Sequence, residues 1–289
     1  MSSVQATTAP AVDAAERIGP SALPEVVMRR EATLRNWAVH SLLQCKRLLL
    51  VWARDPATTI QTLVYPALTL LMFRIVLGDS ITAFTGQPSI YGQVALLTLV
   101  AAMSGAVVSA LGFKVEKAAG LLGRFWTMPI HRAAGLTGRL LAEGVRVLIT
   151  TLCVIGVGML LGFRFQQGPV AAIALIGIPV LFGLAFAILV TALATITEGV
   201  MLVNVIGVIN TLLMFFNTGF VPAFAYPSWL RATIENQPMS CAIDAIRGLS
   251  YGGPVAEPML KTLVWSLGIV AVCAYPAIRG YRRAAETGA

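Results

Sequence analysis

Long apolar runs alternate with short polar segments along most of the chain. Six of these runs approach the roughly 20 residues that a helix needs to cross about 30 Å of hydrocarbon. They predict membrane-spanning helices over approximately residues 57–77, 94–113, 140–162, 170–195, 200–222 and 260–278. Only a few polar residues separate the fourth run from the fifth, so we expect a tight turn near Glu198. The pattern predicts an all-α polytopic membrane protein.

The segment before the first run has two parts. Residues 1–30 are rich in Ala, Ser, Thr and Pro and predict a disordered tail, which leaves one transmembrane domain over residues 31–289. Between Leu34 and Trp52 apolar residues recur at three- and four-residue steps, with Arg35, His40 and Arg47 on the other side. This pattern favours an amphipathic helix lying in the membrane interface, and the alternative is a helix packed on a soluble partner.

The long polar segment before the last run, residues 223–259, predicts two short helices. Ser228 and Ser240 are candidate caps, and Pro238 breaks the chain between them. Ile243 and Ile246 give the second helix an apolar face. A soluble loop would not need that face, so we expect a re-entrant or interfacial helix pair.

The basic residues indicate the orientation of the spans. The segments before Pro56, between the second and third runs, and after the last run hold 15 of the 21 lysines and arginines. With six spans these segments share one side, so the bias places both termini in the cytoplasm of a plasma-membrane protein. The net charge of +8 does not indicate nucleic-acid binding, because the basic residues are scattered between apolar runs.

Catalytic and metal-binding motifs are missing from the sequence. None of the four lysines follows a glycine, so the chain has no P-loop for ATP. The two histidines are far apart, and no CxxC, HExxH or GxSxG motif occurs. We expect no cofactor, metal or ATPase site on this chain, and the spans lack the clustered groups of a membrane-embedded enzyme.

Polar residues inside the runs are candidates for transport. Glu143 and Arg146 are three residues apart and predict an intramembrane ion pair, although they can instead reach the interface. The fifth run predicts a polar and Met/Phe-lined substrate path formed by Asn210, Met214, Phe215, Phe216 and Asn217. Asn210 and Asn217 are seven residues apart and are expected to share a helical face with Met214. The alternative is that its asparagines join helices by hydrogen bonds.

A compact basic stretch, GLLGRFWTMPIHRAAGLTGRL, follows the second run. Its glycines and Pro129 punctuate a short helix that carries Arg124, Phe125, Trp126 and Met128. Arginine and aromatic residues dominate protein interfaces, which favours docking of a cytoplasmic partner. The alternative is a basic loop lying on anionic lipid.

The order of these elements resembles the ABC-2-type permeases of ATP-binding-cassette exporters. The resemblance covers about residues 38–285. LLLVWARDPATT, GLLGRFWTMPIHRAAGLTGRLLAEGVR, LGFRFQQG and NQPMS resemble more specifically the daunorubicin-resistance-type permeases of actinobacteria, which include mycobacterial exporters of phthiocerol dimycocerosate.

The resemblance implies an exporter of a lipid or amphipathic drug-like compound. Two permease subunits, identical or homologous, would pair within membrane lipid, and two ATPase subunits carrying ATP and Mg would bind below. The residues that match the family's coupling helix are Arg124, Phe125, Trp126, Met128, Pro129 and Arg132. The outer helices would form a lid with Trp229, Pro238, Ile243 and Ile246. The alternative function is a secondary transporter or channel that is not driven by ATP.

Overall fold

The computed structural model describes residues 33–128, 130–197 and 199–286. Among these residues it contains α-helices and one 3-10 turn, and no strand, which confirms the all-α prediction for this part of the chain. The predicted tail over residues 1–30, Pro129 and the turn residue Glu198 lie outside the described residues. The helices are α1 (Leu34–Arg54), α2 (Pro56–Thr85), α3 (Ile90–Ala118), α4 (Leu121–Thr127), α5 (Ala134–Leu160), α6 (Gly168–Ile196), α7 (Gly199–Phe215), α8 (Ser228–Asn236), α9 (Pro238–Ser250) and α10 (Ala256–Glu286).

Five helices, α2, α3, α5, α6 and α10, are long and apolar enough to cross a membrane. Each begins before its predicted run, and all but α5 also end after it. The helix α7 is shorter, with 17 residues, and it ends at Phe215 rather than near residue 222. The described ends of α6 and α7, Ile196 and Gly199, are consistent with the break expected near Glu198.

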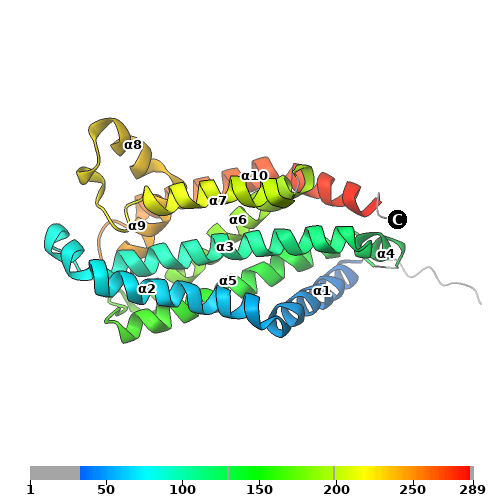
Figure 1. Cartoon of the computed structure of the whole chain (residues 1–289), viewed down its shortest axis with the longest axis horizontal. Helices are drawn as coiled ribbons and strands as arrows, with labels where there is room; N and C mark the ends of the chain where they lie inside the picture. Colours follow the sequence, from blue (N-terminus) through cyan, green and yellow to red (C-terminus); the bar gives the residue numbers. More distant parts are fainter. Residues whose placement is uncertain (1–32, 129, 198, 287–289) are drawn as a thin grey trace, which may run out of the picture.

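The helix α3 forms the centre of an elongated bundle. It packs against α2, α5, α6, α7 and α9, and most of its apolar window is buried. Figure 1 shows α8 and α9 at one end of the bundle, while α4 and the carboxy terminus lie at the other. The long helices join these two ends of the bundle.

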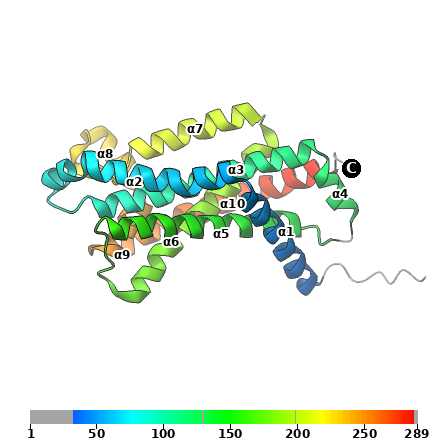
Figure 2. The same ribbon diagram turned by 60° about the horizontal axis from the view of Figure 1, so that its bottom comes forward.

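The amino-terminal helix α1 crosses the bundle obliquely at the α4 end, as Figure 2 shows. It packs on α5, where Gly138 allows a close approach: a Cβ there would lie 2.6 Å from the Cβ of Gln44 and 2.8 Å from the Ser41 carbonyl oxygen. The Ser41 and Thr137 hydroxyls form a hydrogen bond of 2.6 Å beside this contact. A helix is therefore present over the predicted residues, and one side of it packs on the bundle.

The two short helices predicted after α7 are both present, but their predicted caps are wrong. Ser228 is the first residue of α8, and Ser240 lies inside α9. The helix α9 begins instead at Pro238, which suits the first turn because proline lacks the N–H that would remain unpaired there. Ile243 and Ile246 are fully buried, so the apolar face of α9 packs into the end of the bundle.

Candidate functional site

The short helix α4 has one face in the bundle and one face outside it. Gly120 precedes it with φ of 68°, a left-handed conformation that turns the chain sharply away from α3. Leu122 is buried in the core, whereas Arg124 and Met128 are exposed. The helix is therefore anchored on one side and presents a basic and apolar surface on the other.

Arg47 of α1 connects α4 to the neighbouring helices. Its guanidinium carbon lies 4.8 Å from the ring centroid of Phe125, within the range of a cation–π contact. Its Nη2 donates a hydrogen bond of 2.6 Å to Oε1 of Glu116 on α3. One side chain thus contacts both α4 and α3.

Glu116 also binds a second arginine, Arg139 of α5, through its other carboxylate oxygen. Arg139 donates a 3.0 Å hydrogen bond to the Ser109 carbonyl oxygen, and its side chain is only 5% exposed. We call Arg47, Glu116, Phe125 and Arg139 the arginine cluster. It joins α1, α3, α4 and α5 at one point.

Aromatic packing extends the cluster to α10. The Arg139 guanidinium lies over the Phe113 ring at 5.4 Å, and Phe113 stacks on Tyr281 with ring centroids 5.5 Å apart. Tyr281 also approaches α5 closely at Gly135, where a Cβ would meet its hydroxyl group. A displacement of α4 would therefore also displace α1, α3, α5 and α10, which this chain of contacts joins to it.

Only part of the cluster was predicted from the sequence. The structure brings Phe125 into it and leaves Arg124 and Met128 on the outer surface. Arg132 is exposed and lines a small pocket with Phe125 and Tyr281, and a second pocket of about 280 Å³ with Tyr281 and Arg282. The Trp126 side chain and Pro129 lie outside what the structure describes.

The contacts of Arg47, Glu116 and Arg139 were not predicted from the sequence. A signal was present, because Glu116 is the only acidic residue between Lys114 and Arg139, a stretch with five basic residues. A single carboxylate among so many basic groups indicates a specific ion pair.

Glu143 and Arg146 are paired deeper in α5. Their Oε2 and Nη2 atoms are 2.5 Å apart, and the side chains are 1% and 11% exposed. The pair faces α3, where Gly105 leaves room for the carboxylate: a Cβ on Gly105 would lie 2.8 Å from Oε1 of Glu143. The two side chains are covered by protein and do not extend to the surface.

A groove of about 360 Å³ lies between α2, α3 and α7. Asn210 lines it together with apolar residues and with the polar side chains of Gln61, Thr62 and Ser104. Of the residues predicted for a substrate path, Asn210 is the member that the groove includes. Met214 is half-buried against the core, and Phe215 and Phe216 are exposed elsewhere.

Asn217 corrects the prediction that it shares a helical face with Asn210. It lies beyond the end of α7, and its side-chain amide donates hydrogen bonds to the carbonyl oxygens of Leu213 at 3.0 Å and Met214 at 2.5 Å. Its Oδ1 accepts a 2.7 Å bond from Gly219 N–H. The seven-residue spacing failed because the helix ended first, and Asn217 instead satisfies the backbone groups left open there.

The residues predicted as a lid lie at the opposite end from α4. Trp229 of α8 is exposed, Pro238 begins α9, and Ile243 and Ile246 are core residues. Among the described residues there is no group of three or more His, Cys, Asp or Glu side chains placed to hold a metal ion.

Comparisons with known proteins agree on one family. A family model described as ABC-2 type transporter matches residues 42–251. Probable doxorubicin resistance ABC transporter permease proteins DrrC from two strains of Mycobacterium tuberculosis are 42% identical over 250 residues, which cover 86% of this chain and 91% of each relative. The daunorubicin resistance ABC transporter permease protein DrrB1 of Streptomyces coeruleorubidus is 28% identical over 264 residues, 90% of this chain and 92% of the relative.

Proposed function

The chain belongs to the ABC-2 type transporter family, and from this premise we propose that it is the membrane subunit of an exporter driven by a separate ATPase. The observation that carries the proposal is the two-sided α4. Its outer face carries the exposed Arg124, with the exposed Met128 directly after the helix, and its inner face carries Phe125, which contacts Arg47. An element that transmits force needs both properties.

In this proposal the ATP and Mg sites belong to the partner. ATP binding closes a pair of ATPase subunits and displaces α4, and the cluster transfers this motion to α1, α3 and α5 through Arg47, Glu116 and Arg139. The bundle then changes between inward-facing and outward-facing arrangements, as a two-state element biased by a ligand bound elsewhere.

We further propose that α7 is the sixth span. Its 17 residues make a helix about 25 Å long at 1.5 Å per residue, close to the thickness of the hydrocarbon layer. Six spans put α1, α4 and the end of α10 on one side, and the excess of basic residues supports the cytoplasm for that side. The helices α8 and α9 are then extracellular and form the lid on the exit.

For the substrate we propose a lipid or an amphipathic drug-like compound, taken from the cytoplasm or the inner leaflet. The groove between α2, α3 and α7 supports this proposal, because its apolar walls carry a few polar groups such as Asn210. The names of the relatives, which refer to resistance to doxorubicin and daunorubicin, support an amphipathic compound. A second permease subunit would cover the groove, since α2 beside it is largely exposed.

Reconstitution tests the proposal. The purified chain and its ATPase subunit are reconstituted together into lipid vesicles with the ATPase side outward, and ATP-dependent accumulation of doxorubicin inside the vesicles is measured. We expect no ATP hydrolysis by the chain alone, and at least about a tenfold loss of transport in Arg124→Glu, which is equivalent to about 1.4 kcal/mol of coupling. Arg164→Glu is the matched control, because Arg164 is an exposed arginine at the other end of the bundle.

Transport that runs on a proton gradient without an ATPase would contradict the proposal and support the secondary transporter. Full ATP-driven transport by Arg124→Glu would leave the exporter in place but remove α4 as its point of contact.

A further inference from the structure

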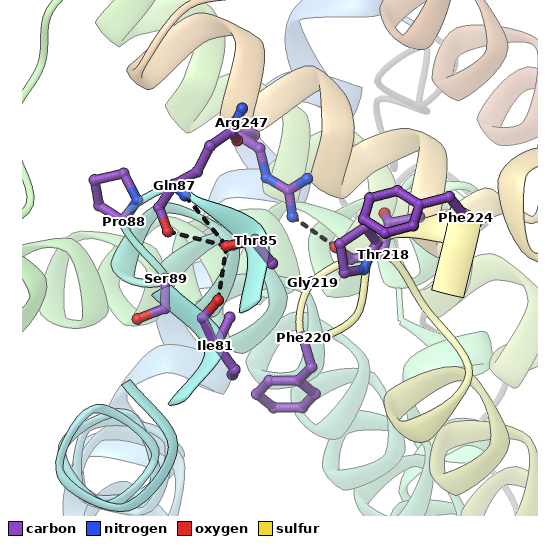
Figure 3. Close-up of a pocket in the computed structure, with 12 residues that line it drawn as sticks. Ile81, Thr85, Gln87, Pro88, Ser89, Thr218, Gly219, Phe220, Phe224 and Arg247 are labelled. Carbon is purple, nitrogen blue, oxygen red and sulfur yellow. Dashed lines mark hydrogen bonds between the residues drawn. The ribbon is translucent and has the colours of Figure 1, made fainter. Parts of the chain in front are cut away.

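A pocket of about 220 Å³ opens at the end of the bundle opposite α4. It lies between the turn that joins α2 to α3, the segment after α7, and α9, as Figure 3 shows. Three kinds of side chain meet in it: the polar Gln87 and Ser89, the aromatic Phe220 and Phe224, and the cationic Arg247. The transport mechanism proposed above uses none of them.

Arg247 supplies the positive charge of this pocket. Figure 3 shows its guanidinium directed toward the segment after α7, where Nη2 donates a 2.5 Å hydrogen bond to the Thr218 carbonyl oxygen. Its Nη1 forms an ion pair with Asp244, whose Oδ1 lies 3.6 Å away and also accepts a 2.9 Å hydrogen bond from the Thr218 hydroxyl. A guanidinium has five N–H donors, so within the described residues most of these donors remain for a ligand.

Glycine keeps space beside this guanidinium. A Cβ on Gly92 of α3 would collide with the Gly219 carbonyl oxygen and would lie 2.9 Å from Nη2 of Arg247. Any other residue at position 92 would therefore push Arg247 away from its present position. Across the pocket, Gln87 is exposed and brings a second hydrogen-bonding side chain.

The position of the pocket favours an amphiphile over a free ion. It lies where α2 ends at Thr85 and α3 begins at Ile90, which is the depth of lipid headgroups if these helices span the membrane. At its edge Phe224 is 63% exposed and stacks with Phe84 at a centroid distance of 6.3 Å. A ligand with its charged group on Arg247 can lay an apolar part across this aromatic edge.

We infer that this pocket binds the phosphate headgroup of an anionic membrane lipid. Arginine binds phosphate through two parallel charge-assisted hydrogen bonds, a geometry that lysine lacks. The inference goes beyond the proposed function, because it assigns a lipid site that needs neither the ATPase nor the exported compound.

Native mass spectrometry of the full chain in non-ionic detergent tests the inference. The probe is dioctanoyl phosphatidic acid, with dioctanoyl phosphatidylcholine and inorganic phosphate as the comparison ligands. We expect one saturable phosphatidic acid adduct that is weakened at least about tenfold by Arg247→Gln and less by Arg247→Lys. The matched control Arg164→Gln, at an exposed arginine that is not in the pocket, should leave binding unchanged.

A second variant covers the case in which Arg247→Gln does not fold. Gln87→Ala changes a loop residue, leaves the contact between Arg247 and Thr218 in place, and should weaken the adduct severalfold. Equal binding by wild type, Arg247→Gln and Gln87→Ala would overturn the inference. Displacement of the lipid by inorganic phosphate at equal concentration would also contradict it, since the site would then serve a free ion.

Discussion

Replacing Glu116 with glutamine should disrupt the arginine cluster while hardly changing the size of the side chain. The carboxylate of Glu116 accepts from Arg47 at 2.6 Å and from Arg139 through its second oxygen. A glutamine can accept through one oxygen only and turns its NH₂ group toward the other guanidinium. Arg139, which is 5% exposed, then keeps its charge without a carboxylate partner.

The expected cost follows from the burial of the two arginines. Removing one partner of a buried ion pair costs about 3–5 kcal/mol, whereas exposed pairs contribute about 0.2–1 kcal/mol. The side chain of Arg47 is 33% exposed, so its half of the interaction is screened by solvent. We therefore expect the free energy of unfolding to fall by about 3 kcal/mol, most of it from Arg139.

Reversible unfolding in mixed micelles, followed by circular dichroism, measures this change. Glu286→Gln is the control, because Glu286 pairs with Arg282 at 2.8 Å with both side chains well exposed. A double-mutant cycle with Arg139→Gln isolates the pair. If Glu116→Gln and Glu286→Gln reduce the free energy of unfolding equally, the cluster does not hold these helices together and the reasoning is wrong.

Three further changes test other parts of the structure. Gly138→Ala should cost about 1–3 kcal/mol by separating α1 from α5, whereas Gly156→Ala, where a Cβ meets open space, should be neutral or stabilising in the same assay. Asn217→Ala should cost about 1–3 kcal/mol through lost hydrogen bonds, and the exposed Asn204→Ala should cost little. Burial raises the pKa of Asp244 above its usual value of 3.8. The stability that comes from this raised pKa is therefore complete below pH 3.8 and is lost as pH rises through the raised pKa. Asp244→Asn should remove this pH dependence of the free energy of unfolding, and an unchanged pH profile would refute the prediction.

The apolar runs were sufficient to predict the long helices, because the bilayer sets one length for every span. The failure at α7 has a local cause: Phe216, Phe220 and Val221 prolong the apolar run, yet the helix ends at Phe215, before Asn217 and Gly219. Hydropathy identifies the apolar segments of a chain, but it does not identify the residue at which the helical backbone hydrogen bonds end.

Less of the candidate site than of the fold could be predicted from the sequence. Arg124, Phe125 and Met128 were predicted from residue type, and the structure sorts them into outer and inner faces. Arg47 and Glu116 are 69 positions apart, so no helical period relates them. Contacts of this kind arise from the packing of α1 across α5, where Gly138 permits a close approach.

The contact between α4 and an ATPase is the central claim, and site-specific photo-crosslinking tests it most directly. A photoreactive residue replaces Met128, which is exposed beside α4, or, as a control, Leu160 at the far end of α5. In cells that produce the whole transporter, we predict a crosslink from position 128 to a protein that mass spectrometry identifies as an ATP-binding-cassette ATPase, and none from position 160. A crosslink to that ATPase from position 160 but not from position 128 would contradict the account.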